Sequence, residues 1–245
     1  MSHHTKTTEE CAADAVVLRH EADKIGFLGV SEPTPESQRI FDEDVTNVGH
    51  VMNASRLWAY QPATMTGLFD LLRRANSTES LSLRQRLILV AACASAFGDA
   101  YCSLVWGSRL ATAGEAQTAA GVLRGSDEGL NTSERVMAGW ARKVARDPNA
   151  TSAADVQALR DAGFSDAEIF TITVFVALRL AFSTVNDALG VPPDAALRST
   201  APGVVLDAVT FGRPIGGVGR ASGAGGQHVR VPGRAPWRGV PGPAV

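Results

Sequence analysis

Chemical signals for the start and end of α-helices recur along most of this chain. Capping boxes begin at Ser82 and Ser165, and Thr34 stands as an N-cap directly before a proline. Gly163 and Gly190 follow helical runs at positions typical of C-terminal caps. No stretch alternates apolar and polar residues with a period of two. These features predict an all-α protein, a multi-helical bundle.

The apolar periodicity also predicts where the helices lie. We expect helices near 8–26, 35–48, 50–60, 62–76, 83–97, 99–112, 114–123, 132–146, 152–162 and 166–189, with a further short one near 203–210. In the helix at 166–189, five apolar residues share one face at helical spacing: Val174, Ala177, Leu178, Ala181 and Val185. The pattern predicts that this face packs within the bundle.

Composition and charge divide the chain into three segments. We expect an N-terminal extension at 1–33 that is partly helical, a helical domain at 34–212, and a disordered Gly/Pro/Arg-rich tail at 213–245. All 25 acidic residues but only 18 of the 23 basic residues lie in 1–211. This acidic body argues against nucleic acid as a partner. The basic tail could touch an anionic surface or the body itself, or be a solvated extension without a task.

Several classes of protein are excluded at this stage. The longest apolar stretches, at 87–97 and 169–182, are too short or are interrupted by Arg179, so neither predicts a membrane span of about 20 residues. The N-terminus has no apolar signal core. The odd cysteine count (Cys11, Cys93, Cys102) leaves a free thiol, which suits a reducing cytoplasm. Phosphate loops, dinucleotide fingerprints and zinc-binding His pairs are absent, so we expect no metal and no cofactor.

One junction between two predicted helices carries the clearest chemistry. An apolar helix ends at Gly98, and the next begins with Asp99 and places Cys102 in its first turn. Free backbone N–H groups and the helix dipole favour a thiolate there, which makes Cys102 a candidate nucleophile. The negative charge of Asp99 acts in the opposite direction and raises the pKa of the thiol. Cys102 could equally be a small buried core residue.

Three segments in a fixed order resemble a known family. Leu81–Arg86 resembles a Leu-Ser-x-Arg-x-Arg helix start, Gly98–Cys102 a Gly-Cys-x-Tyr-Cys turn, and Val185–Val191 a closing Asn-x-x-Ala-Asp-x-Leu-Gly element. With Val51–Arg74 resembling the preceding helical pair, the likeness covers roughly residues 36–212. In this pattern the chain resembles the alkylhydroperoxidase D-like and carboxymuconolactone decarboxylase superfamily of all-helical proteins.

The resemblance implies a role for each matched position. In peroxidase members of the family, the second Cys of a Cys-x-x-Cys pair attacks peroxide while a Glu and a His relay protons. Cys102 occupies the attacking position. Asp99 stands where the resolving Cys would be, Leu87 where the Glu would be, and Trp106 where the His would be. The standard cycle therefore cannot operate unchanged, although an external thiol, Cys93 or Cys11 could resolve a sulfenate. The Glu and His used by the decarboxylase members are missing too.

The side chains around Cys102 predict an apolar pocket. Trp106 follows Cys102 by one helical turn and shares its face, and Tyr101 is adjacent in sequence. Such a pocket suits a small hydrophobic ligand, or acid–base chemistry by a buried Asp99. Arg86 and Arg179 are candidates to line it, and Arg179 could hold a substrate carboxylate.

Arg179 also has a simpler interpretation. It lies in an otherwise apolar helix, where we expect it to pair with an acid such as Asp99 or Asp187, or to extend to the surface. In that case it would have a structural role. Asn186 and Asp187 are expected to be polar groups at the end of that helix.

Three functions remain open from the sequence. The first is a one-cysteine thiol peroxidase at Cys102, acting on a peroxide. The second is a decarboxylase-like or isomerase-like enzyme that uses Asp99 on a small organic acid or lactone. The third is a non-catalytic, ligand-binding helical oligomer. A homo-oligomer is expected in each case, because the family builds its sites against neighbouring subunits and an apolar face such as Leu68–Leu72 would otherwise be exposed.

Overall fold

The computed structural model describes residues 24–76 and 81–216. It begins with a short antiparallel hairpin, β1 (Lys24–Ile25) and β2 (Leu28–Gly29), in which Ile25 pairs with Leu28. The helices are α2 (Pro35–Val48), α3 (Asn53–Trp58), α4 (Pro62–Ala75), α5 (Leu83–Phe97), α6 (Ala100–Leu110), α7 (Ala116–Leu123), α8 (Thr132–Arg146), α9 (Ala153–Asp161), α10 (Asp166–Ala188), α11 (Leu197–Thr200) and α12 (Gly203–Leu206). The all-α prediction is thus confirmed.

The ends of the chain bring one correction. The helix predicted at 8–26 is wrong at its C-terminal end, where the hairpin stands instead, because Gly26 adopts a left-handed conformation with φ of 63° and turns the chain. Residues 8–23 of that predicted helix lie outside the described residues, as does the predicted tail from residue 217 onward.

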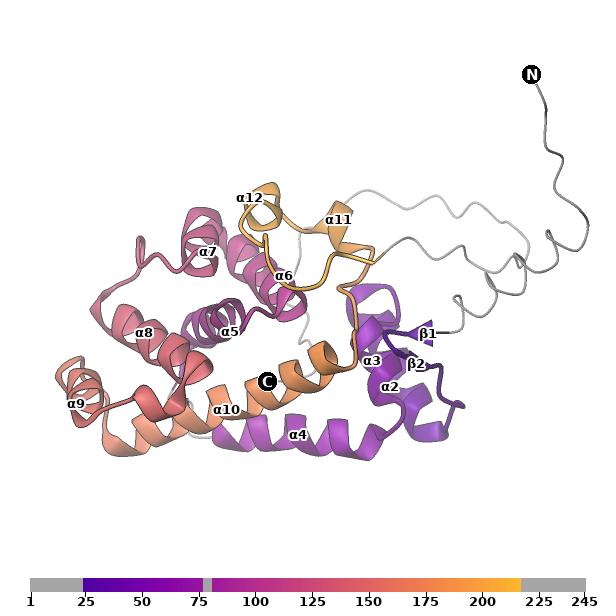
Figure 1. Ribbon diagram of the computed structural model, residues 1–245, viewed down its shortest axis with the longest axis horizontal. Helices are drawn as coiled ribbons and strands as arrows, with labels where there is room; N and C mark the ends of the chain where they lie inside the picture. The colour runs from indigo at the N-terminus through magenta and orange to yellow at the C-terminus, as the bar shows by residue number, and fades with distance from the viewer. Residues whose placement is uncertain (1–23, 77–80, 217–245) are drawn as a thin grey trace, which may run out of the picture.

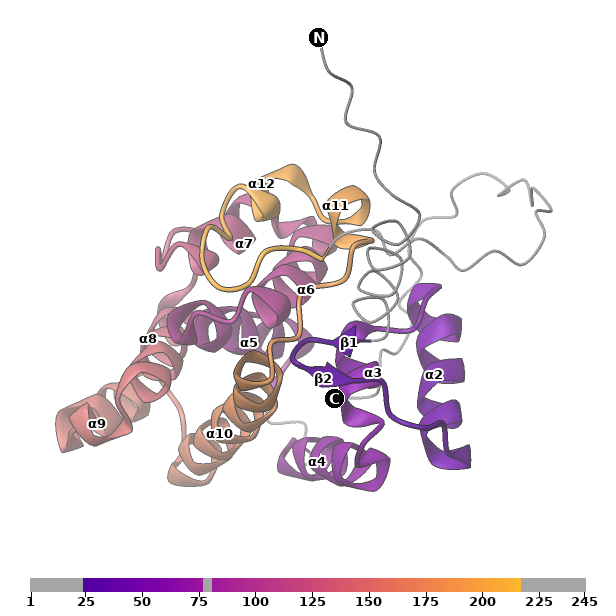
Figure 2. The same cartoon turned by 45° about the vertical axis from the view of Figure 1, so that its right-hand side comes forward.

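Helix α5 is the centre of the bundle. Its residues from Leu87 to Ala94 are all buried, and it packs against α6, α7, α8 and α10. A helix that is apolar on every side is the expected core element of such a bundle. Figures 1 and 2 show the helices around it, with α8 and α9 at one end of the molecule and α2, α3 and the hairpin at the other.

Helix α10 lies beside α4 and also packs against α5 and α8 (Figure 1). Its buried stripe includes Ile172, Phe175 and Phe182 together with the polar residues Arg179 and Ser183. The face predicted from apolar periodicity is only partly buried, and Leu178 and Val185 on it pack against the core. Val174, Leu178 and Val185 are half-buried, and Ala177 and Ala181 are exposed. The buried stripe was hidden from a hydrophobicity pattern because it carries polar side chains.

The length and apolar character of α10 also fit a membrane span. Its mean hydropathy over an 18-residue window is 1.7, but it packs against four other helices as a core element of the bundle.

The expected exposed apolar face at Leu68–Leu72 is only partly present. Leu71 is 51% exposed, whereas Leu72 is fully buried.

Most helix ends follow the predicted capping chemistry. The boxes at Ser82 and Ser165 are both formed, each with its partner three residues later. Helix α3 begins at Asn53 rather than near 50, and α12 is shorter than predicted. A single π-helical turn, Ala111–Glu115, joins α6 to α7, with Gly114 in the left-handed region at φ of 91°.

Candidate functional site

The predicted junction between two helices is formed as expected. Helix α5 ends at Gly98, which adopts φ of 91°, and α6 begins immediately with Asp99 as its N-cap. One carboxylate oxygen of Asp99 accepts a hydrogen bond of 2.9 Å from the backbone N–H of Cys102. This cap fixes Cys102 in the first turn of α6.

Helix α10 adds a residue that the sequence did not single out. The hydroxyl of Ser183 donates to the other carboxylate oxygen of Asp99 at 2.5 Å, and its oxygen lies 3.7 Å from the sulfur of Cys102. Asp99, Ser183 and Cys102 are 0%, 2% and 3% exposed. Helices α6 and α10 thus bring these three side chains into one buried polar centre. Its only sequence signal is the position of Ser183, one helical turn after Arg179.

The thiol of Cys102 is suppressed as a nucleophile. Burial raises its pKa well above the ordinary value, and the negative charge of Asp99 and a hydrogen bond with it raise the pKa further. The charge of Arg179 and the hydroxyl of Ser183 act in the opposite direction but are weaker influences. The sulfur is enclosed beside an acid, and burial and Asp99 outweigh the influences that lower the pKa of the thiol.

Arg179 takes neither of the two predicted arrangements. It is 2% exposed, so it does not reach the surface, and no acid pairs with it in the described part of the chain. Its Nε and Nη2 atoms are buried without a hydrogen-bond partner. The guanidinium instead lies 4.3 Å from the ring centroid of Trp106 and 5.5 Å from that of Phe175. Burial lowers its pKa to about 10, so it stays charged at neutral pH.

Two further arginines face the same region. Arg109 follows Cys102 by about two helical turns on α6. Its guanidinium lies 4.6 Å from the ring centroid of Trp106. Arg86, predicted from the sequence, is half-buried on α5, and its Nε is enclosed without a partner. The charges of Arg109 and Arg86 both lower the pKa of Arg179, so the three cations lie within electrostatic reach. Arg109 was not singled out from the sequence, although its position three residues after Trp106 on one helix is a signal that could have indicated it.

Tyr101 belongs to a different cluster. Its hydroxyl donates to Asp194 at 2.6 Å and accepts from the backbone N–H of Ala54 at 3.4 Å. Asp194 also accepts the backbone N–H of Asn53 at 2.7 Å and lies 3.7 Å from the ring of His50. Tyr101 therefore connects α6 to the start of α3. The sequence predicted Tyr101 beside Trp106 and Arg179, but the hydroxyl of Tyr101 lies in this other cluster.

The remaining sequence candidates have structural places. Cys93 is buried in α5 as a free thiol, and burial raises its pKa to about 12, which suits a core residue. Asn186 accepts a hydrogen bond of 2.9 Å from the indole N–H of Trp58. Asp187 lies half-buried at the end of α10, where burial raises the pKa of its carboxyl group to about 6.

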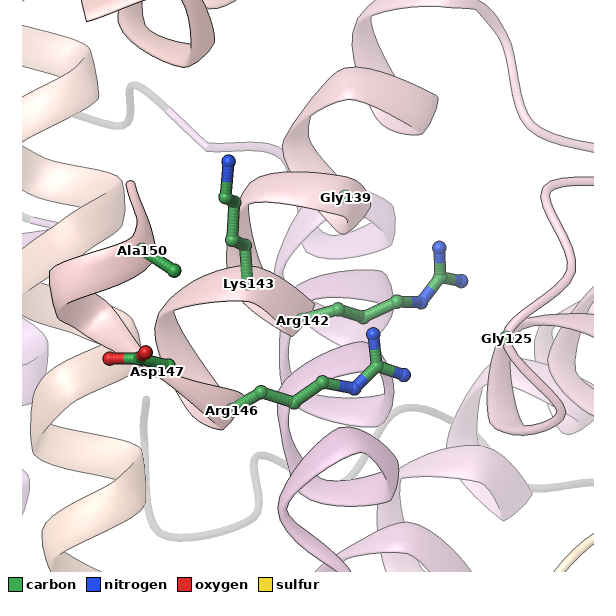
Figure 3. A pocket seen from close by; sticks show the side chains of 7 residues that line it. All are labelled: Gly125, Gly139, Arg142, Lys143, Arg146, Asp147 and Ala150. Atoms are coloured by element: carbon green, nitrogen blue, oxygen red, sulfur yellow. The ribbon is translucent and has the colours of Figure 1, made fainter. Parts of the chain in front are cut away.

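Two clefts in the described residues are lined by residues other than Cys102. One, of about 500 Å³, lies along α8 beside Gly125, and Figure 3 shows Arg142 and Arg146 projecting toward that glycine. Arg142 is held by Asp127 at 2.7 Å, so its charge is already paired. A second cleft, of about 290 Å³, borders α6 at Ala100 and Leu104. Across residues 24–76 and 81–216, no cluster of His, Cys, Asp and Glu could hold a metal ion.

Comparison with known proteins adds solved structures of the same fold. No sequence profile of a known family matches the chain, and no curated protein matches it. An uncharacterized peroxidase-related protein from a Silicibacter species superimposes with a TM-score of 0.63 at 21% identity, covering 72% of this chain and 96% of that one. An alkylhydroperoxidase AhpD core protein from Ralstonia eutropha, also peroxidase-related, gives 0.62 at 23% identity, covering 71% and 95%.

A further similar structure comes from a protein with a different printed activity. The debrominase Bmp8, in complex with 2,3,4-tribromopyrrole, superimposes with a TM-score of 0.57 at 17% identity, covering 71% of this chain and 91% of that one. These likenesses show that the chain has the alkylhydroperoxidase D-like fold. The fold expected from the sequence motifs is thus confirmed.

Proposed function

We propose that this chain is a divergent alkylhydroperoxidase D-like protein that has lost the dithiol peroxide cycle and binds a small molecule in the same part of the fold. The sealed centre of Cys102, Asp99 and Ser183 carries this proposal. Only a thiolate attacks peroxide efficiently, and a buried thiol with a raised pKa stays protonated at neutral pH. Asp99 has become the N-cap of α6, which is a structural task.

The surroundings support binding. The rings of Trp106 and Phe69 lie next to the charged group of Arg179. Small-molecule sites are commonly built in this way, from apolar walls with a few polar groups that orient the ligand. The debrominase named above, which has this fold, was solved with a small organic ring compound.

A one-cysteine thiol peroxidase is the second candidate. It is favoured by the 3.7 Å contact between Ser183 and the sulfur of Cys102, and by the charge of Arg179, both of which lower the pKa of the thiol. The two peroxidase-related neighbours point the same way. In this reaction the thiolate would attack the peroxide O–O bond, giving a sulfenate and releasing an alcohol or water, and a second thiol would reduce the sulfenate. The site would have to open first.

Acid–base chemistry by Asp99, as in a decarboxylase-like or isomerase-like enzyme, has less support. Asp99 is 0% exposed, and its carboxylate oxygens accept hydrogen bonds from the N–H of Cys102 and the hydroxyl of Ser183. A general base must come within hydrogen-bond reach of the proton that it removes from the substrate.

Peroxide consumption and sulfenate trapping separate these candidates. The proposal predicts equal, background rates for the wild type and Cys102→Ser, and no sulfenate at Cys102, because the thiol is protonated and enclosed. A peroxide-dependent sulfenate in the wild type that is absent from Cys102→Ser would replace the proposal with the thiol peroxidase. An activity on an organic acid that survives Cys102→Ser but not Asp99→Asn would establish acid–base chemistry.

We further propose that the protein works in the cytoplasm as a homo-oligomer. The free thiols of Cys93 and Cys102 support a reducing compartment. Exposed apolar side chains, among them Phe170 at 71% and Phe27 at 65%, support burial against another copy. Light scattering of the full chain tests the oligomer, and a monomeric mass would contradict it.

A further inference from the structure

We propose that Arg179, Arg109 and Arg86 form a binding site for a small organic carboxylate, with the ring of Trp106 as its apolar wall. This inference rests on the proposed function, because it names the class of small molecule bound in the same part of the fold. Its basis is a buried positive charge that the described protein leaves unmatched.

The isolation of Arg179 is unusual within this molecule. Other partly buried arginines hold carboxylates: Arg84 donates to Glu134 at 2.7 Å, and Arg142 is paired with Asp127 at 2.7 Å. Arg179 is more deeply buried than Arg84, yet two of its nitrogens have no partner. A buried ion without a counter-ion carries a large desolvation penalty, and buried N–H groups are nearly always hydrogen-bonded.

The aromatic contacts of Arg179 offset only part of that penalty. The guanidinium lies 4.3 Å from the ring centroid of Trp106 and 5.8 Å from that of Phe69. Such cation–π contacts are favourable, but they are weaker than the cost of removing a guanidinium from water, and they leave the N–H groups unsatisfied. An acceptor that reaches Nε and Nη2 would satisfy both.

The two neighbouring arginines also lack a carboxylate partner in the described part of the chain. Arg109 contacts Trp106 at 4.6 Å, and the enclosed Nε of Arg86 lacks a partner. No hydrogen bond or ion pair to an acid is formed by either within residues 24–76 and 81–216. Each of the two charges disfavours the charged form of Arg179. Three like charges in one region repel one another, and an anion among them converts the repulsion into attraction.

The surroundings favour a carboxylate attached to an apolar body. A planar guanidinium donates two parallel hydrogen bonds to a carboxylate. The rings of Trp106 and Phe69 favour an apolar body and disfavour a doubly charged anion such as phosphate, which would lose more hydration. Arg86 and Arg109 are half-buried and Arg179 is sealed, so the carboxylate would meet the first two before it reaches the third.

The experiment is calorimetric titration of the full chain with benzoate, with benzamide as a neutral analogue of the same shape and inorganic phosphate as a second anion. We expect benzoate to bind and both others to fail. Arg179→Met, which keeps the volume and removes the charge, should weaken benzoate binding by about tenfold or more, because charge-assisted hydrogen bonds are lost. Arg109→Gln should weaken it as well. Arg39→Gln, on the exposed surface of α2, is the matched control and should leave it unchanged.

A second readout does not depend on the choice of carboxylate. Without ligand, Arg179→Met should melt at or above the temperature of the wild type, because an unmatched buried charge is removed. A large fall in melting temperature would mean that Arg179 has a counter-ion, for instance from a second copy of the chain, and would overturn the proposal.

The two proposals fail in different ways. Equal binding of benzoate and benzamide, or binding of phosphate alone, would overturn the carboxylate assignment. The proposed function would survive that result if peroxide leaves Cys102 unoxidised. A sulfenate at Cys102 would overturn the proposed function whatever benzoate does. Absence of benzoate binding would also overturn the inference, whatever the melting temperature of Arg179→Met.

Discussion

Asp187 occupies a place that disfavours its charge. Burial raises the pKa of its carboxyl group from 3.8 to about 6, the negative charge of Asp99 adds to this, and Arg213 acts against it. The folded chain therefore binds this proton more tightly than the unfolded chain does. The resulting stabilisation is fully present below about pH 4 and is lost as the pH rises through about 6.

The variant Asp187→Asn tests this pH dependence. It should raise the melting temperature at pH 7.5 and have a smaller effect at pH 5, because the wild-type carboxyl is largely protonated at the lower pH. Thermal unfolding at the two pH values measures it, with Asp42→Asn on α2 as an exposed control. Equal effects of Asp187→Asn at both pH values would contradict the raised pKa.

Asp99 stabilises the fold through its two hydrogen bonds. Asp99→Ala removes the N-cap of α6 and leaves the buried N–H of Cys102 and the hydroxyl of Ser183 without an acceptor, so we expect a loss of about 2–4 kcal/mol in unfolding free energy. Asp99→Asn keeps a capping oxygen and should lose less. Urea denaturation compares the two. A loss for Asp99→Ala that stays within the error of the wild type would contradict this role.

At the scale of elements, α10 determines how the bundle is held together. Phe175 is completely buried, with 0% of its surface exposed, whereas Phe170 on the same helix is 71% exposed. Phe175→Ala should cost about 3–5 kcal/mol of unfolding free energy, because a large cavity forms in the core. Thr184→Ala, at an exposed position of the same helix, is the control and should stay within about 0.5 kcal/mol of the wild type. Similar losses in both would contradict the assigned orientation of α10.

The same helix marks the limit of sequence-based prediction. Helix ends depend on local chemistry, so Ser82 and Ser165 predicted where α5 and α10 begin. The buried face of α10 depends on which helices pack against it, and Arg179 and Ser183 on that face are invisible to a count of apolar residues. The position of Cys102 in α6 could be predicted for the same local reason as the caps, whereas its enclosure by α10 could not.

At the scale of the whole molecule, the arrangement of the helices and the chemistry of the side chains at the site are separate questions. The alkylhydroperoxidase D-like arrangement of helices is retained in the described chain, as the solved neighbours show. The junction of α5 and α6 places Cys102 in the first turn of α6, where Asp99 caps the helix, and Trp106 contacts two guanidinium groups. The fold therefore places the site without determining its reaction.

The accessibility of Cys102 in the native chain tests the account most directly. The measurement is the rate of iodoacetamide labelling at Cys102, followed by peptide mass spectrometry, for the full chain in buffer and in urea. The account predicts that Cys102 reacts in urea and stays unlabelled in the native protein at neutral pH, because its thiol is enclosed and protonated. Native labelling as fast as in urea would show an open, ionised thiol and would contradict the account.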